Sequence, residues 1–546
     1  MTDYDVVVIG AGIGGLYAIE RLRGQGLSVL AVESGSGVGG VWHHNRYPGA
    51  RVDIDSIDYC FHFSRELTRD WRWTERYASQ DELLRYLNHV ADRFDLRRHI
   101  LFETTVTAAQ WRPDEARYDV ETGSGQRFTC RFLLLATGNL SAARKPDFPG
   151  LDDFKGDWVQ TSHWPDRDVQ IAGKRIAVIG TGSSGVQAAT ALAERAGHLF
   201  VFQRTANYSV PAGNVPLDAA VLDAVFAEPN RREALLNSRI GSRLELEGGV
   251  LNYADYSEAE RLDRLERQWT KGGQGMNRVF ADQGLDLAVN TVVADFVRAK
   301  IRQTVHDPAT AERLCPYDYP IGSRRLIMDT GYYEIFNRPN VTLVDVAADP
   351  IERITESGIR LKSGAEHEVD LIVFALGFHA FRGAMERIDI RNEKGEHLTG
   401  GWSRGPRALL GLMTTGFPNL FFPTGPGGPS VLSNMVLMNE QQIDFVGELI
   451  AHMDARGMRT VQPDRDAQDA WMDEVAAAAS KLIRLNVDNY MVHVNSDDGS
   501  RVFIPYVGGL DRFNRTCRAV AADGFRGFVF GQALEPTQPS ASTEPA

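Results

Sequence analysis

Two glycine-rich turns, at residues 10–15 and 180–185, have the spacing that lets a backbone pass close to the pyrophosphate of a dinucleotide. Each follows an apolar run typical of a buried parallel strand and precedes a segment with helical spacing, whose N-terminus would face the phosphates. The chain is therefore predicted to hold two dinucleotides. The turn residues are Gly10, Gly12, Gly14 and Gly15 in the first copy, and Gly180, Thr181, Gly182, Ser183, Ser184 and Gly185 in the second.

The residues after the next strand differ in charge between the two copies. Glu33 lies 18 residues past Gly15, where a carboxylate can accept hydrogen bonds from an adenosine ribose and would repel a 2′-phosphate. Arg204 and Thr205 hold the corresponding place in the second copy and can bind a 2′-phosphate. The first site is thus predicted to take FAD or NAD and the second NADP. The alternative, two glycine-rich turns without ligands, is disfavoured by these opposite charges.

A strand, a glycine turn and a helix in each copy indicate an α/β fold. We predict two Rossmann-like dinucleotide-binding domains with a mostly helical insertion. A linker rich in Pro and Gly, from about 145 to 172, joins the two units. Apolar strands ending in small residues, at 132–138 and 371–377, predict that the chain leaves and re-enters both domains. The predicted divisions are 1–145 with 375–531 for the first domain, 146–210 with 321–374 for the second, 211–320 for the helical insertion, and 532–546 for a disordered tail.

Composition narrows the functional classes. At 546 residues the chain suggests two or three domains, and 43% hydrophobic with 24% charged residues is typical of a soluble globular protein. A formal charge of −13 disfavours nucleic acid as a partner, and no uncharged apolar stretch approaches the roughly 20 residues of a membrane span. The first strand begins within five residues of Met1, which predicts no signal peptide and a cytoplasmic location.

The four cysteines are scattered, with no C-x-x-C pair and no cysteine and histidine cluster at metal spacing. No metal is therefore predicted. A disulfide reductase with a redox-active cysteine pair beside a flavin is excluded for the same reason.

The segment 39–53 fits no regular periodicity and carries the most specific motif of the chain. It resembles the type I Baeyer-Villiger monooxygenases, FAD- and NADPH-dependent enzymes that insert one oxygen of O2 beside a ketone carbonyl. The family fingerprint is Gly-x-Trp, four residues, an aromatic, Pro, Gly, three residues and Asp. Every fixed position is matched, by Gly40, Trp42, Tyr47, Pro48, Gly49 and Asp53, and the likeness extends over residues 3 to 531.

The resemblance implies a C4a-peroxyflavin that attacks the ketone, with Arg325 and Asp53 as the catalytic residues. An arginine beside the flavin would stabilise developing negative charge, because its guanidinium stays charged at any working pH. By motif position this residue is Arg325, which would also touch the nicotinamide end of NADP, and Asp53 would orient it. Arg324 would assist Arg204 at the 2′-phosphate. The alternatives are a surface cation for Arg325 and a turn-capping carboxylate for Asp53.

The resemblance also implies the remaining contacts. FAD would be held by the first glycine turn and by Glu33, Gly40, Val41, Trp42, Asp53, Tyr59, Val106, Thr137, Gly138, Asn434 and Met435. NADP would be held by the second glycine turn and by Arg51, Gln187, Arg204, Thr205, Arg324 and Arg325. The substrate pocket would include Ile54, Ser430, Val431, Leu432 and Asn489.

The chain departs from the family pattern at two places. Gln160 stands where a second, shorter family fingerprint has His. A glutamine cannot carry a positive charge, but it keeps a hydrogen-bond donor and an acceptor. This suits a structural role in the interdomain linker. In the run 488–495 Asn489 stands in place of the family Trp, so a lid over NADP and substrate would lose a large apolar contact.

The leading hypothesis is a Baeyer-Villiger monooxygenase that converts a small-molecule ketone to an ester or lactone with NADPH and O2. One alternative is a related flavin monooxygenase that oxygenates a sulfide or amine, or hydroxylates its substrate. A second is an uncoupled NADPH- and FAD-binding redox sensor, which would release only H2O2. The sequence names neither the ketone nor the oligomeric state, and it is compatible with a monomer.

Overall fold

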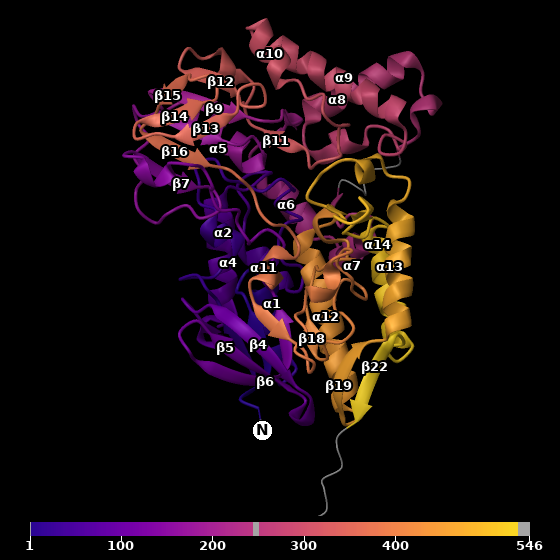
Figure 1. The fold of residues 1–546 in the computed structure, drawn as a ribbon. Helices are drawn as coiled ribbons and strands as arrows, with labels where there is room; N and C mark the ends of the chain where they lie inside the picture. Colours follow the sequence, from indigo (N-terminus) through magenta and orange to yellow (C-terminus); the bar gives the residue numbers. More distant parts are fainter. Residues whose placement is uncertain (1, 244–249, 533–546) are drawn as a thin grey trace, which may run out of the picture.

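The computed structural model describes residues 2–243 and 250–532 (Figure 1). The first domain is built on an eight-stranded sheet in the order β17-β4-β5-β6-β1-β2-β3, with β18 pairing with β6. Strands β3, β2, β1, β6 and β18 are parallel, and β4 and β5 form an antiparallel meander with β6. The strands are β1 Tyr4–Ile9, β2 Val29–Val32, β3 Ile100–Leu101, β4 Val106–Arg112, β5 Arg117–Thr122, β6 Arg127–Leu135, β17 Asp389–Arg391 and β18 Leu420–Phe421.

The centre of this sheet is apolar on both faces. Val6, Val7 and Val8 of β1 are fully buried. Val6 and Val8 belong to an apolar cluster with residues of the following helix, and Val7 belongs to a second cluster with residues of β4, β5 and the segment 385–422. Helix α1 (Ile13–Gly24) follows the first glycine turn and packs against α12 (Met435–Asp454), which returns from the far end of the chain. The first glycine turn is therefore fixed between a buried strand and a two-helix layer.

The second domain has a five-stranded parallel sheet in the order β12-β9-β8-β16-β7. Helix α5 (Ser183–Ala193) follows its glycine turn, and a small antiparallel sheet of β13 (Ile351–Ile354), β14 (Gly358–Leu361) and β15 (Glu366–Glu368) packs on one face. The strands are β7 Asp157–Gln160, β8 Arg175–Ile179, β9 His198–Gln203, β12 Val341–Asp345 and β16 Leu371–Phe374. The predicted fold class, two Rossmann-like domains with a helical insertion, is confirmed.

One local prediction is wrong. The sequence places Gln160 in an interdomain linker, but in the structure it ends β7, the edge strand of the second sheet, and is paired in register with Phe374. Only Val159 of β7 is buried, so the pairing depends on backbone hydrogen bonds rather than on an apolar pattern that the sequence displays.

The segment between β9 and β12 is mainly helical. At its base β10 (Ser209–Pro211) pairs in parallel with β11 (Ile327–Asp329). Helices α8, α9 and α10 lie together beside the second sheet in Figure 1, and α7 contacts α14 of the first domain. The helices are α6 Ala219–Phe226, α7 Arg231–Leu236, α8 Glu258–Lys271, α9 Leu287–Thr304 and α10 Pro308–Leu314.

The other elements belong to the first domain and its C-terminal part. The tail that the sequence predicts to be disordered lies, from residue 533 onward, outside the described residues. Within residues 2–243 and 250–532, no helix is both long and apolar enough to span a bilayer. The elements are α2 Val41–His44, α3 Arg65–Asp70, α4 Gln80–Arg93, α11 Gly383–Glu386, β19 Met458–Pro463, α13 Arg465–Ala479, β20 Val492–Val494, β21 Arg501–Phe503, α14 Leu510–Ala522 and β22 Phe528–Gln532.

Two segments that connect the domains run side by side. Residues 139–144 leave the first sheet and residues 377–381 return to it, and the two are joined by backbone hydrogen bonds. Arg144 N donates to Gly377 O at 3.0 Å, and His379 N donates to Ala142 O at 2.8 Å. These crossings lie close to the predicted boundaries, and we propose the division into domains given above on that basis.

Candidate active site

The first glycine turn is required by close backbone contact. Gly10 has φ +107°, and a Cβ there would lie 2.6 Å from the carbonyl oxygen of Ala136, at the end of β6. A Cβ at Gly15 would overlap the carbonyl oxygen of Gly10. Gly12 is the N-cap of α1 and offers no side chain to cap the helix. The first N–H groups of α1 are thus free of a side-chain cap at the place where a pyrophosphate would bind.

The second turn repeats this geometry. Gly180 has φ +106°, and a Cβ there would lie 2.5 Å from the carbonyl oxygen of Ala375, at the end of β16. At Gly182, the N-cap of α5, an added Cβ would have no atom within 4 Å. Gly180 and Gly185 are therefore fixed by packing, whereas Gly182 borders open space that suits a phosphate.

Glu33 is nearly buried at the end of β2 and its carboxylate links two loops. It accepts hydrogen bonds from the backbone N–H of Ala11 and of Gly35, each at 2.7 Å. The carboxylate is thereby held at the tip of β2, where the sequence predicts a ribose contact.

Two cations, Arg204 and Arg324, are predicted to bind the 2′-phosphate of NADP. Arg204 is exposed after β9, and the Arg324 guanidinium lies 4.4 Å from the ring centre of Tyr319. Tyr319 donates to Asn207 Oδ1 at 2.7 Å, and Asn207 donates in turn to the carbonyl of Thr181 at 2.7 Å. Arg324 is thus connected to the glycine turn through Tyr319 and Asn207, two residues that sequence reasoning missed because no local pattern marks them.

Asp53 and Arg325 form a two-point ion pair between the domains. Arg325 Nη2 donates to Asp53 Oδ1 at 2.8 Å, and Arg325 Nε donates to Asp53 Oδ2. A third donor, Nη1, reaches the carbonyl of Val431 at 3.0 Å. Burial opposes the charge of the guanidinium, but Asp53 outweighs it, so the pKa of Arg325 lies above its ordinary value. The side chains keep 29% and 27% exposure, which leaves a fixed cation open to a ligand.

The fingerprint segment positions Asp53 by docking onto the second domain. Tyr47 donates its hydroxyl hydrogen to Gln187 Oε1 of α5 at 2.7 Å, and Gln187 Nε2 donates to the carbonyl of Arg51 at 3.2 Å. A Cβ at Gly49 would lie 2.5 Å from the carbonyl oxygen of Gln187, so only glycine allows this approach. The aromatic and glycine positions of the motif therefore fix the loop that carries Asp53 against the helix after the second turn.

The residues predicted to line the flavin meet near this pair. Trp42 Nε1 donates to the Tyr59 hydroxyl at 3.2 Å, and the rings lie edge to face. Burial raises the pKa of Tyr59 to about 12, although the hydrogen bond from Trp42 acts against the rise. Asn434 caps α12 and donates to the carbonyl of Asp58 at 2.6 Å, which ties the start of α12 to the segment before Tyr59.

The segment 488–495 contains an aromatic residue, Tyr490, beside Asn489. Tyr490 stacks on Phe381 with ring centres 6.4 Å apart, and burial raises its pKa while the charge of Arg325 acts against the rise. Asn489 uses its side chain within the turn, donating to the carbonyls of Arg484 and Val487 and accepting from Met491 N. Tyr490 therefore supplies an aromatic contact of this segment with the loop that carries Phe381.

The structure places the other predicted positions in turns, in loops and at strand ends. Ser430, Val431 and Leu432 form one 3₁₀ turn, and Val431 and Leu432 belong with Met435 to an apolar cluster that includes Phe381. Gln160 Nε2 donates to the carbonyl of Arg144 at 2.9 Å, a structural bond that needs no charge. Ile54 is half-buried one residue after Asp53, Val106 is buried at the start of β4, and Val41, Thr137 and Gly138 lie in the loops after Gly40 and β6.

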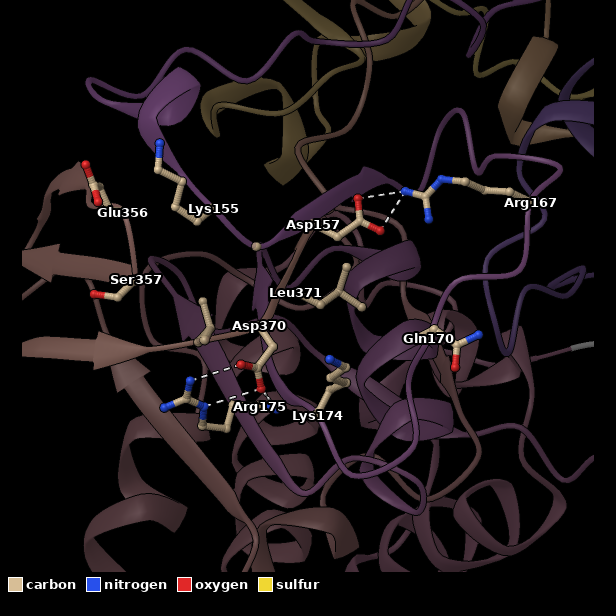
Figure 2. A pocket seen from close by; sticks show the side chains of 12 residues that line it. Lys155, Asp157, Arg167, Gln170, Lys174, Arg175, Glu356, Ser357, Asp370 and Leu371 are labelled. Carbon is tan, nitrogen blue, oxygen red and sulfur yellow. Dashed lines mark hydrogen bonds and ion pairs between the residues drawn. The ribbon is translucent and has the colours of Figure 1, made fainter.

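A surface hollow of about 860 Å³ lies elsewhere, at the amino ends of β7, β8 and β16 (Figure 2). Dinucleotides bind at the opposite, carboxyl ends of parallel strands. Its charges are largely paired with one another: Arg167 with Asp157 at 2.6 Å, and Arg175 with Asp370 at 2.9 Å. This hollow is therefore separate from the site of Arg325. Within the described part of the chain, no group of three His, Cys, Asp or Glu residues is arranged to hold a metal ion.

Comparison with known proteins places this geometry in a family. Residues 3–219 match the family described as flavin-binding monooxygenase-like. A Baeyer-Villiger monooxygenase of Pseudooceanicola batsensis is 39% identical over 98% of this chain and 97% of its own length. An oxidized steroid monooxygenase bound to NADP is 46% identical, with a TM-score of 0.91 over 97% of this chain and 100% of that chain. The structure of OTEMO with FAD and NADP is 37% identical, with a TM-score of 0.92 over 97% and 100%.

These similarities span almost the whole chain, both nucleotide turns and the Asp53 fingerprint. The family predicted from the fingerprint is confirmed, and with it the enzyme class. The chain belongs to the Baeyer-Villiger monooxygenases.

Proposed function

We propose that the chain is an FAD- and NADPH-dependent monooxygenase that inserts one oxygen atom of O2 beside the carbonyl of an apolar ketone. The products are an ester or lactone, NADP⁺ and water. The observation that carries the proposal is the two-point pair of Arg325 with Asp53, held by a third bond to Val431.

The residues present fit both cofactors. The first turn offers uncapped helix N–H groups and a buried carboxylate at Glu33, which suits a ribose without a 2′-phosphate. The second turn offers open space at Gly182, and Arg204 is exposed directly after β9. Arg324 is connected to the same turn through Tyr319 and Asn207. FAD, when bound, supplies the group that accepts hydride from NADPH and activates O2.

Arg325 supplies the fixed positive charge. Negative charge develops on oxygen when a nucleophile attacks a ketone carbonyl, and a guanidinium that needs no reorganisation stabilises it. Asp53 occupies Nε and Nη2, and the Val431 carbonyl occupies part of Nη1, so the fork cannot rotate freely. The chain thereby fixes both the position and the charge of the cation.

The substrate side of the site is apolar. Phe381, Val431, Met491, Phe503 and Ile504 form one buried cluster, and Val431 is also the residue whose carbonyl binds Arg325. An apolar wall beside one cation suits a ketone whose only polar group is its carbonyl.

The test is product analysis under ¹⁸O2. The FAD-loaded protein is incubated with NADPH and a panel of cyclic, aryl and polycyclic ketones, and we expect one labelled oxygen atom in the ester or lactone. Sulfides and amines in parallel incubations measure the alternative oxygenations, and a peroxide assay measures uncoupled turnover. Full FAD loading with NADPH oxidation but no oxygen-inserted ester from any ketone would contradict the proposal.

A further inference from the structure

Asn139 is a buried residue at the start of the segment that leaves the first domain. Its side chain and backbone are only 9% exposed, and its carbonyl accepts a hydrogen bond from Phe381 N at 3.0 Å. The main chain of Asn139 is therefore fixed by the segment that returns from the second domain.

The side-chain amide of Asn139 joins two residues of a strained loop. Its Nδ2 donates to Ser430 Oγ at 2.7 Å and to the carbonyl of Thr424 at 3.0 Å. Ser430 and Thr424 have φ of +49° and +60°, a left-handed conformation that L residues adopt at a cost, and both are buried. Asn139 thus holds two residues that need an external restraint, with a further contact to Thr424 Oγ1 at 3.5 Å.

This loop carries the carbonyl that binds Arg325. Ser430 precedes Val431 within a single 3₁₀ turn, so a shift of Ser430 moves the Val431 carbonyl directly. Arg325 Nη1 lies 3.0 Å from that carbonyl. A continuous set of bonds therefore runs from the amide of Asn139 through Ser430 and Val431 to the guanidinium.

We propose that Asn139 is a positioning residue for the oxygen insertion, acting through Ser430 and Val431 on Arg325. The inference rests on the proposed function. One NADPH, one proton and one O2 can give either an ester and water, when a ketone is attacked, or H2O2, when it is not. Loss of the bond from Asn139 to Ser430 leaves the Arg325 guanidinium less firmly positioned. A larger share of the NADPH consumed then ends in H2O2 and a smaller share in ester.

The test compares Asn139→Ala and Ser430→Ala with a matched control. Both variants should load FAD normally and lower the fraction of NADPH that ends in ester at least threefold, with a matching rise in H2O2. Because Asn139→Ala already removes the bond to Ser430, the double variant should lose no more than Asn139→Ala alone. The control is Asn419→Ala, since Asn419, like Asn139, is a buried amide, and it donates to the carbonyls of Arg131 and Arg459. Asn419→Ala should lower the stability of the protein but keep the wild-type ratio of ester to H2O2.

A second readout does not depend on turnover. NADP⁺ should raise the Tm of the wild-type protein, and this rise should be at least halved in Asn139→Ala and unchanged in Asn419→Ala. The inference would be overturned if folded Asn139→Ala kept the wild-type ratio of ester to H2O2 and the wild-type effect of NADP⁺ on Tm. Equal losses in Asn419→Ala would also overturn it, as would a double variant that loses more ester than Asn139→Ala. If Asn139→Ala does not fold, Ser430→Ala decides by the same criteria. Absence of ester from the wild-type protein would contradict the proposed function instead, while the Tm comparison would still test Asn139.

Discussion

Asp53 and Arg325 are 272 positions apart in the chain, and two parallel hydrogen bonds join the guanidinium of Arg325 to the carboxylate of Asp53. Each comes from a different part of the fold: Asp53 from the loop that docks onto α5, and Arg325 from the residues just before β11. The geometry of this ion pair therefore depends on how the two nucleotide-binding units are placed relative to each other. A change in that placement must alter the direction in which the guanidinium points.

We expect Arg325→Lys to lose most of the oxygen insertion although the charge is kept. Lysine has no planar fork, so it cannot bind both carboxylate oxygens and the Val431 carbonyl at once. The rate of ester formation should fall about 10²–10³-fold, the size seen when one preorganised donor is removed from an active site. Product formation is measured in single turnovers with FAD loading checked by absorbance.

Arg175→Lys is the matched control for this prediction. Arg175 also pairs with a carboxylate through two donors, to Asp370, but at the hollow on the opposite edge of the second sheet. Its replacement should leave ester formation near the wild-type rate. Equal losses in the two variants would show that the effect comes from general destabilisation.

The sequence predicts local features well and long-range side-chain contacts poorly. The two turns, Glu33 and the basic tip at Arg204 follow from spacing along the chain. The contact of Tyr47 with Gln187, in contrast, joins two domains, and nothing near either residue indicates its partner. The same holds for Asn139 and Ser430, which are 291 positions apart.

Two further differences have physical causes. Gln160 lies in an edge strand held by backbone pairing, which leaves no apolar alternation to detect. Asn489 is predicted to cost an apolar contact, but its side chain turns back onto its own loop. The aromatic contact is made by Tyr490 with Phe381, a residue distant in the chain that no local pattern indicates.

Gly182→Ala and Gly185→Ala should separate binding from folding. A Cβ at Gly185 would overlap the carbonyl oxygen of Gly180, so Gly185→Ala should lower the yield of folded protein and its Tm. A Cβ at Gly182 meets no protein atom within 4 Å, so Gly182→Ala should fold normally and bind NADP⁺ more weakly, since the methyl group occupies the space beside the helix N-terminus. Thermal melts and NADP⁺ titrations measure the two effects. Normal NADP⁺ affinity in Gly182→Ala would place the cofactor elsewhere.

Arg204→Ala should reduce the preference for NADPH over NADH. Arg204 is exposed at the tip of β9, where a 2′-phosphate is expected, and its charge has no role in the core. We expect KM for NADPH to rise roughly tenfold, the effect of losing about 1.4 kcal/mol of binding, with little change in KM for NADH. Steady-state kinetics with both nucleotides measure the ratio. Parallel increases for NADPH and NADH would mean that Arg204 does not recognise the 2′-phosphate.

His62 should make the protein less stable in mild acid. Burial lowers the pKa of His62 to about 3, against an ordinary value of 6.5, and its Nε2 lies 3.2 Å from the carbonyl oxygen of Asp58. Between these two pKa values the unfolded chain binds a proton that the folded chain does not, so stability is full above pH 6.5 and is lost as the pH falls toward 3. His62→Gln keeps a donor for the Asp58 carbonyl but cannot take up the proton. Its Tm should therefore fall less than the wild-type Tm when the pH is lowered from 7 to 5, and identical pH dependence of the two proteins would rule out His62 as the cause.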